Sequence, residues 1–280
     1  MKKALSLMTA AALVLSLAAC GSTASSAASS EAASPEAASS DAASSEAASE
    51  TETAELSTVE PGKLIMSTNA AFPPYEMTTD SGEFEGIDIE TAQAIADKLG
   101  LELQIDDMDF DAALLSVQQG KADIVMAGVT VTDERKAVMD FSDSYATGIQ
   151  SIIVPEGSDI TSPDDLAGKK IGTQRGTTGY IYCSDDFGDD AVVAYDDGLT
   201  AVQALNNGQV DAVVIDNAPA KEFVAANPGL VILDTSYAEE DYAIGLAKGS
   251  ALEDAVNAAL EELKADGTLQ SIVDKYITAE

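Results

Sequence analysis

The chain contains no histidine and no tryptophan, only two cysteines, and only two arginines among 280 residues. Histidine is the side chain most often used for acid–base catalysis near neutral pH. The chain also lacks the G-x-S-x-G motif that places a nucleophilic serine in many hydrolases. An enzyme built from this sequence would therefore have to rely on Asp and Glu as its acids and bases.

Positive charge is scarce as well. The 49 acidic residues outnumber the 14 basic ones and give a formal net charge of −35. Nucleic acids and anionic lipids select basic surfaces, so the charge argues against both as partners. Residues 61–280 alone carry a net charge of −29, so the acidity belongs to the part of the chain that can fold as well as to its N-terminus.

The N-terminus has the pattern of a secretion signal. Lys2 and Lys3 precede an apolar run over 4–19, which is shorter than the roughly 20 residues of a membrane span. The run ends in LAACG, which resembles the bacterial lipobox, where the signal is removed before the cysteine. We therefore expect a signal peptide over 1–19 and lipidation of Cys20. The alternative is an ordinary signal peptide with a chance cysteine.

A segment rich in Ser, Ala and Glu follows from residue 20 to residue 60, and no basic residue occurs between Lys3 and Lys63. Such a composition cannot bury enough apolar surface to form a core, so it predicts a spacer, with partial helicity left open. A lipid anchor and a long spacer suggest the outer face of the cytoplasmic membrane in a Gram-positive cell. With Cys20 lipidated, Cys183 has no disulfide partner and is expected to be a packed small residue.

From Lys63 onward, short apolar runs alternate with helical patterns, which predicts βαβ units around parallel or mixed sheets. The pattern then restarts at Ser151. The predicted strands are 64–68, 101–105, 123–127, 151–156, 169–174, 190–195, 211–216 and 242–248. The predicted helices are 88–100, 110–119, a short one at 163–168, one from about 177, one between 195 and 211, and two near 250–265 and 267–277.

An internal similarity predicts two lobes of like design. ALLSVQQGKADIVMAG (113–128) and AVQALNNGQVDAVVID (201–216) align at a constant offset of 88 residues. Common αβ patterning is the simpler explanation, since Gly often ends a helix. The alignment also pairs Gly128 with Asp216, each at the C-terminal end of its strand. Because ligands bind outside those ends in open α/β sheets, we expect a cleft between the lobes.

An arginine on one wall of that cleft and a carboxylate on the other suit a zwitterion. Arg135 would bind an α-carboxylate through its planar fork, and Asp216 would bind an α-ammonium group. Thr132 is expected to cap a helix that runs to about Met139. The alternative for Arg135 is a surface ion pair with Asp133, Glu134 or Asp140.

Two loops carry further candidates. GTQRGTTG (172–179) lies between a strand and a helix, so Thr177 and Thr178 can present N–H groups to an anion. It lacks the GK[ST] ending of a phosphate loop. Phe72, Tyr75 and Phe110 are either core residues or flat walls around a ligand side chain.

These motifs resemble, in order along residues 61–280, the polar amino-acid binding proteins of ABC importers. AGVTVTDERKAVMDFSDSY (127–145) is the strongest match, to glutamine- and histidine-type binders. The resemblance implies a binding set composed of Asn69, Phe72, Phe110, Ala127, Gly128, Thr130, Arg135, Gln174, Thr177, Thr178 and Asp216. It implies that Arg135 and Thr178 take the α-carboxylate and Asp216 the α-amine, with Gly128 and Thr130 nearby. Phe72 and Phe110 would sandwich the side chain.

The resemblance also implies a two-lobed periplasmic-binding-protein-like fold of type II, in which two mixed-sheet α/β lobes are joined by two hinge strands. Lobe 1 would comprise 61–147 plus 244–280, and lobe 2 would comprise 148–243. The lobes would close on a free amino acid and dock on permease subunits of an ABC transporter. The resemblance implies no cofactor, no metal and no catalysis, and a monomer is expected.

Departures from the family pattern bear on the substrate. Asn69 stands where the histidine and glutamine binders carry an acid, which weakens the case for a cationic ligand. Arg175 adds a positive charge, and Ile215 offers no polar side chain beside Asp216. We therefore favour a polar neutral amino acid, with glutamine and cystine both open and an acidic ligand not excluded.

Other functions remain as alternatives. A cyclohexadienyl- or arogenate-dehydratase-like enzyme shares this fold, and an amino-acid sensor or adhesin uses the same domain. A metal-binding protein is a further possibility, because residues 107–111 imitate the start of an EF-hand loop. That loop departs from the motif at Ala112 and Gln118, which stand where Gly and Glu belong.

Overall fold

The structure is a computed structural model, and it describes residues 56–277. The predicted signal peptide, Cys20 and nearly all of the spacer lie outside the described residues. Within 56–277, none of the helices combines the length and apolar character needed to cross a bilayer.

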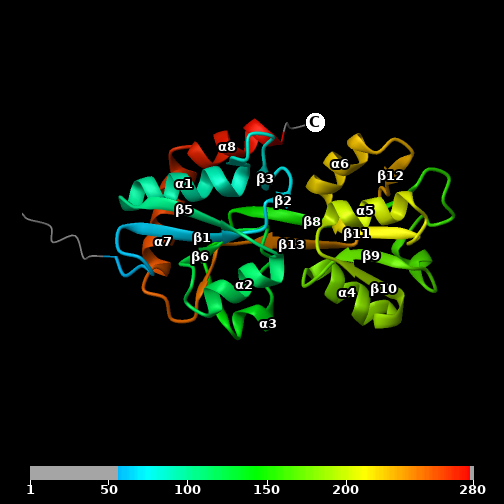
Figure 1. Cartoon of the computed structure of the whole chain (residues 1–280), viewed down its shortest axis with the longest axis horizontal. Coiled ribbons are helices and arrows are strands. Elements are labelled where there is room, and N and C mark those ends of the chain that lie inside the picture. The colour runs from blue at the N-terminus through cyan, green and yellow to red at the C-terminus, as the bar shows by residue number, and fades with distance from the viewer. Residues whose placement is uncertain (1–55, 278–280) are drawn as a thin grey trace, which may run out of the picture. The chain divides into compact units, whose positions relative to one another are not determined.

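One sheet has five strands in the order β5-β1-β6-β14-β7 (Figure 1). β1 runs parallel to β5 and β6, whereas β14 is antiparallel to both of its neighbours. The strands are β1 (Lys63–Thr68), β5 (Glu102–Asp107), β6 (Ile124–Val125), β7 (Met139–Phe141) and β14 (Gly245–Ala247). The helices of this part, which we call lobe 1, are α1 (Ile87–Leu99), α2 (Phe110–Gln118), α3 (Asp133–Lys136), α7 (Glu253–Ala265) and α8 (Thr268–Tyr276).

The second sheet has the order β10-β9-β11-β8-β12, and β13 also pairs with β8. Its strands are β8 (Ala146–Pro155), β9 (Ile171–Gln174), β10 (Val192–Tyr195), β11 (Ala212–Asp216), β12 (Leu230–Ile232) and β13 (Ala238–Tyr242). Its helices are η1 (Pro163–Leu166), α4 (Thr178–Phe187), η2 (Asp189–Ala191), α5 (Gly198–Asn206) and α6 (Asn217–Ala226). We call this part lobe 2; most of it lies on the right of Figure 1, while β8 and β13 reach toward lobe 1.

A small third sheet, β2-β3-β4, lies beside lobe 1. It consists of β2 (Ala71–Phe72), β3 (Glu76–Thr78) and β4 (Phe84–Glu85), and the sequence patterns did not predict it. Met77 of β3 pairs with both Ala71 and Glu85, so the sheet folds the segment after β1 back on itself. This fold brings Phe72 and Glu76 to the side of the main sheet.

The repeat at an offset of 88 residues is confirmed in three dimensions. α2 and α5 begin and end at positions that differ by 88, and each is followed by a glycine with positive φ, 65° at Gly120 and 66° at Gly208. Asp123 then accepts a hydrogen bond from Ile65 N at 2.8 Å, and Asp211 accepts one from Lys170 N at 2.7 Å. In both lobes an aspartate at the start of a buried strand therefore ties that strand to its parallel neighbour.

Two sequence predictions were wrong in detail, and one helix was missed. The helix after Thr132 has one turn and not two, because Met139 instead enters β7 and pairs with β14. The predicted strand 242–248 is interrupted: Tyr242 pairs in lobe 2 and Gly245 in lobe 1, so the chain crosses between the sheets there. α6 was not predicted, although an aspartate cap and Pro219 in its first turn are ordinary start signals.

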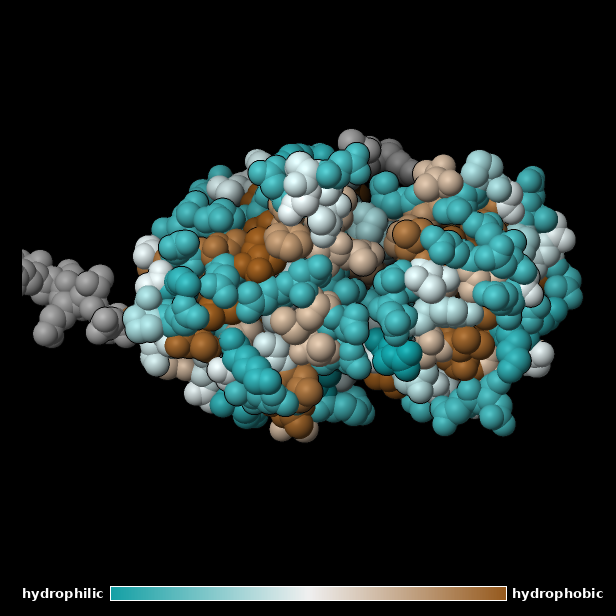
Figure 2. Space-filling model, in the orientation of Figure 1, coloured by the Kyte–Doolittle hydropathy of each residue, from teal (hydrophilic) through white to brown (hydrophobic). Residues whose placement is uncertain are grey.

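The surface agrees with the composition. Hydrophilic side chains cover most of the face shown in Figure 2, with scattered apolar residues between them. Cys183 is buried in the core of lobe 2 with no exposed area, as expected for a packed small residue.

Candidate functional site

A cavity lies between the two lobes at the ends of their parallel strands. The sixteen residues that line it are Asn69, Phe72, Glu76, Phe110, Ala127, Gly128, Thr130, Arg135, Gln150, Gln174, Thr177, Thr178, Val214, Ile215, Asp216 and Tyr242. The structure therefore brings all eleven predicted binding residues to one cavity. Their loops meet because β1, β6, β9 and β11 end there, as open α/β sheets predict.

Arg135 is aimed into this cavity by the one-turn helix α3. Thr132 caps the turn and accepts a hydrogen bond from Arg135 N at 3.2 Å. The guanidinium group donates to Thr130 O at 2.8 Å and to Gly176 O at 3.2 Å, and it lies 5.4 Å from the centre of the Phe110 ring. Only 8% of the residue is exposed. The surface ion pair with Asp140 does not form, because Asp140 instead pairs with Lys248.

The guanidinium group has capacity left for a ligand. Arginine offers five N–H donors, and the hydrogen bonds of Arg135 to the two carbonyl groups leave three. Burial lowers the pKa of Arg135, although the negative charge of nearby Glu240 raises it. A buried cation whose hydrogen bonds go to carbonyl groups is a suitable receptor for a carboxylate.

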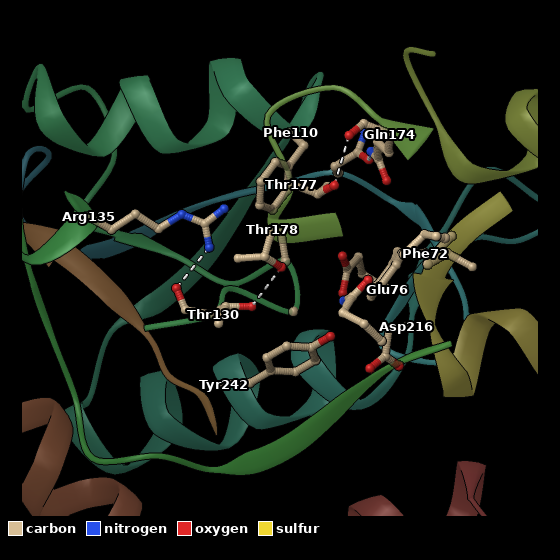
Figure 3. A pocket seen from close by; sticks show the side chains of 16 residues that line it. Phe72, Glu76, Phe110, Thr130, Arg135, Gln174, Thr177, Thr178, Asp216 and Tyr242 are labelled. Carbon is tan, nitrogen blue, oxygen red and sulfur yellow. Dashed lines mark hydrogen bonds between the residues drawn. The ribbon is translucent and has the colours of Figure 1, made fainter. Parts of the chain in front are cut away.

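Asp216 lies on the other side of the cavity, at the junction of β11 and α6 (Figure 3). Its carboxylate accepts from Ala218 N at 2.9 Å and from Ile149 N at 2.7 Å. Burial raises its pKa to about 6, and the two backbone hydrogen bonds oppose that rise. The Tyr242 side chain also hydrogen-bonds the carboxylate and lowers its pKa. A carboxylate has about four lone-pair sites, so the group can still receive an ammonium ion.

A second acidic group, which the sequence patterns did not reveal, underlies the cavity. Glu76 lines it and is 1% exposed, while Asp88, at the start of α1, is fully buried. Asp88 accepts from Gly128 N at 3.0 Å and from the hydroxyl of Tyr145 at 2.7 Å. Burial raises the pKa of Glu76 well above its usual range and that of Asp88 to about 6. In the sequence, Asp88 has the pattern of an ordinary acid in the first turn of a helix.

Asn69 and Gln174 form an amide pair across the cavity. Gln174 Nε2 donates to Asn69 Oδ1 at 2.8 Å, and Asn69 Nδ2 donates to Met108 O at 2.9 Å. Arg175 does not line the cavity: its side chain is 52% exposed and it pairs with Asp196 at 3.2 Å. The cavity is therefore lined here by two neutral amides, and the positive charge of Arg175 lies outside it.

The aromatic residues divide between the wall and the core. Phe72 and Phe110 both line the cavity, whereas Tyr75 packs beneath it, stacked on Phe72 with ring centres 5.9 Å apart. Gly128 allows the loop to approach Phe72, since a Cβ at this position would lie 2.9 Å from that ring and φ is +54°. Any side chain here would be both crowded and strained.

A comparison with known proteins identifies the family. The sequence profile of the bacterial extracellular solute-binding proteins, family 3, matches residues 64–279. The chain belongs to that family. This solute-binding protein is 34% identical over 226 residues to the L-cystine-binding protein TcyJ of Escherichia coli (strain K12), covering 79% of this chain and 85% of the relative. It is 31% identical over 294 residues to the arginine-binding extracellular protein ArtP of Bacillus subtilis (strain 168), with 100% of both chains covered.

Solved structures agree. An ancestral arginine-binding protein bound to glutamine superposes with a TM-score of 0.75 and 42% identity, covering 79% of this chain and 100% of that one. The P235GK mutant of ArgBP from T. maritima gives 0.74 and 38%, with 78% and 96% covered. The predicted two-lobed α/β fold and the family resemblance of this solute-binding protein are thereby confirmed.

Proposed function

We propose that this protein binds a free amino acid in the cavity between its lobes and delivers it to an ABC permease. The observation that carries the proposal is the position of Arg135 and Asp216 on opposite sides of one buried cavity (Figure 3). An α-carboxylate on Arg135 and an α-ammonium group on Asp216 would satisfy both charges at once. A simple carboxylic acid or a simple amine would leave one of them unpaired, at a large cost in a buried site.

The side chain of the ligand would lie between Phe72 and Phe110 and reach the Asn69–Gln174 pair. Asn69 Nδ2 keeps one N–H after donating to Met108 O, and no described residue donates to Gln174 Oε1. A donor and an acceptor at the same place suit a carboxamide. We therefore favour a polar neutral amino acid, with glutamine first and cystine, the ligand named for one relative, second.

One observation favours a second candidate, a cationic amino acid. Glu76 adds a carboxyl group to the cavity beyond those that the α-groups would use. If Glu76 and Asp88 share one proton, their joint negative charge is available to a guanidinium or ammonium side chain. The relatives named for arginine are consistent with this interpretation. For a neutral ligand, Glu76 would instead keep its proton, as burial beside Asp88 favours.

Closure of the lobes would couple binding to recognition by the permease. Hydrogen bonds that join the lobes around the cavity include Gln174 to Asn69, Arg135 to Gly176, Thr130 to Glu240 and one between Thr130 and Thr178. A ligand that touches both walls would stabilise this arrangement over an open one. We place the lobes at 61–147 plus 244–280 and at 148–243, with a lipid anchor at Cys20. We expect a monomer on the outer face of the cytoplasmic membrane that performs no catalysis.

A thermal-shift screen of residues 56–280 with the 20 amino acids and cystine tests the proposal. A ligand that binds only the folded state raises Tm, because it stabilises that state. At a ligand concentration of 100 times Kd the stabilisation is about 2.7 kcal/mol. We expect glutamine or cystine to give the largest shift. A dominant shift with arginine or lysine would select the cationic candidate, and no shift with any of them would refute an amino-acid site.

A further inference from the structure

Glu240 is a buried carboxylate that the roles given above leave unused. It lies in β13, opposite Gly148 of β8, and is 5% exposed. Its Oε2 accepts from Thr130 Oγ1 at 3.0 Å and from Gln150 Nε2 at 3.0 Å, both of which line the cavity. Its Oε1 is buried without a hydrogen-bond partner among residues 56–277. Burying such a group is costly, so its position calls for a reason beyond packing.

The charges around Glu240 are mixed. Arg135 and Tyr182 are near enough for Glu240 to raise the pKa of each, and burial together with Glu240 brings that of Tyr182 to about 12. The charge of Glu240 also raises the pKa of Asp216. Glu240 is held by hydrogen bonds from Thr130 and Gln150.

The hydrogen bond from Thr130 fixes a direction. A hydroxyl group has a single proton, and that of Thr130 is given to Glu240. Thr130 Oγ1 also lies 3.5 Å from Thr178 Oγ1, and in that pair either hydroxyl could donate. Because the Thr130 proton is already engaged, Thr178 must be the donor. Thr130 can therefore offer only a lone pair to the cavity and no proton.

We infer that Glu240 is a positioning residue that separates donors from acceptors in the cavity, and thereby selects a ligand with an α-ammonium group over one with an α-hydroxyl group. The inference rests on the proposed amino-acid function. By holding the proton of Thr130, Glu240 makes Thr130 a second acceptor in the cavity that Asp216 also lines. An ammonium group has three protons and can satisfy both acceptors, whereas a hydroxyl group has one and can satisfy only one.

The experiment measures selectivity and not affinity alone. The probes are L-glutamine and L-arginine, each paired with the analogue in which a hydroxyl replaces the α-amine, and Kd is measured by calorimetric titration. In Glu240→Leu, Thr130 recovers its proton and can donate to the hydroxyl oxygen. We expect the ratio of the two Kd values to fall about tenfold, the usual effect of one hydrogen bond to a charged group.

Two conservative variants separate an acceptor from a charge. Glu240→Gln keeps an oxygen that can accept from Thr130, so the ratio should stay near that of the wild type. Glu240→Asp keeps the charge but is too short to reach Thr130, so the ratio should fall as in Glu240→Leu, and it carries the test if the leucine variant does not fold. Glu239→Gln, the exposed neighbour on the same strand, is the matched control and should change nothing.

Two results would overturn the inference while amino-acid binding persists. An unchanged ratio in Glu240→Leu and Glu240→Asp, even with weaker binding of both probes, would leave Glu240 a structural residue. A ratio that falls in Glu240→Gln but is kept in Glu240→Asp would assign its effect to charge. If the wild type binds neither amino acid, the proposed site is wrong and the inference falls with it.

Discussion

Single residues determine the polarity of the cavity, and Asp216 shows the conflict between stability and function. The residue is 2% exposed and its carboxylate accepts from two backbone N–H groups, while burial raises its pKa to about 6. Without a ligand, the ionised form is therefore buried at a cost. An ammonium partner removes that cost, so the residue that weakens the empty site strengthens the occupied one.

We expect Asp216→Asn to weaken amino-acid binding by about 100-fold or more, because one member of a buried charge pair is lost. The same variant removes the buried charge, and its amide oxygen can still cap α6, but its NH2 group cannot accept from Ile149 N. The gain in stability at pH 7.5 without ligand should therefore be small. The raised pKa sets an upper limit of about 3 kcal/mol on the gain. Calorimetric titration and urea unfolding measure the two effects; a stable variant with wild-type affinity would refute the assignment.

The sign of the pH dependence follows from the same group. The folded-state pKa of about 6 lies above the usual value of 3.8, so the folded state holds the proton between those values. The contribution of Asp216 to stability is therefore present below about pH 4 and is lost as the pH rises through 6. Affinity should change in the opposite direction and fall as the pH drops through 6. Asp88 titrates in the same range, so the effect of Asp216 is the difference between wild type and Asp216→Asn.

At the scale of elements, the two lobes repeat one unit of helix, left-handed glycine and buried strand. Gly120 and Gly208 occupy the same backbone conformation, and at neither position would an added Cβ meet another atom within 4 Å. Asp123 and Asp211 then make equivalent bonds to the neighbouring strand. The repeat places Gly128 and Asp216 at matching strand ends. Gly128 allows the backbone to approach Phe72 closely, and Asp216 supplies a negative charge.

Gly120→Ala and Gly208→Ala should each lower the free energy of unfolding by about 1 kcal/mol, because alanine is strained at positive φ while no neighbour is displaced. Neither change should alter the affinity for an amino acid, since both glycines lie outside the cavity lining. Urea unfolding checks the first statement and titration the second. A cost at only one of the two positions would show that the lobes do not use this turn equivalently.

The elements also show how far structure could be predicted from the sequence. α1 agrees with the predicted helix over 88–100, because Gly100, with φ of 69°, ends it. Local signals of this kind are contained in a few neighbouring residues. Glu76 and Gln150 escaped prediction because their places depend on a small sheet and on a strand that crosses between lobes. Glu240 escaped prediction for a different reason, because an acid in a short strand usually faces water.

At the scale of the whole molecule, negative charge is the dominant feature. Residues 61–280 carry a net charge of −29, and most acidic side chains have no basic partner available. Self-repulsion of this kind destabilises a compact state and is screened by salt. It also bears on the site, because an acidic surface attracts the ammonium end of a zwitterion and repels free carboxylates.

We expect the Tm of the ligand-free protein at pH 7.5 to rise when the sodium chloride concentration is increased roughly tenfold to a physiological level. A gain of about 1 kcal/mol corresponds to about 2–4 °C for a domain of this size. The same salt step at pH 4, where many carboxylates are protonated, should have a smaller effect. Scanning calorimetry checks this, and an equal shift at both pH values would contradict a charge-based origin.

The central claim is that Arg135 and Asp216 hold the two ends of an amino acid, and Arg135→Ala tests it most directly. Calorimetric titration of the ligand with the largest thermal shift should show at least about a 100-fold loss of affinity in Arg135→Ala. The control is Arg175→Ala, because Arg175 is the second arginine of the chain and does not line the cavity. This variant should bind the ligand as the wild type does. Retained affinity in Arg135→Ala would contradict the account.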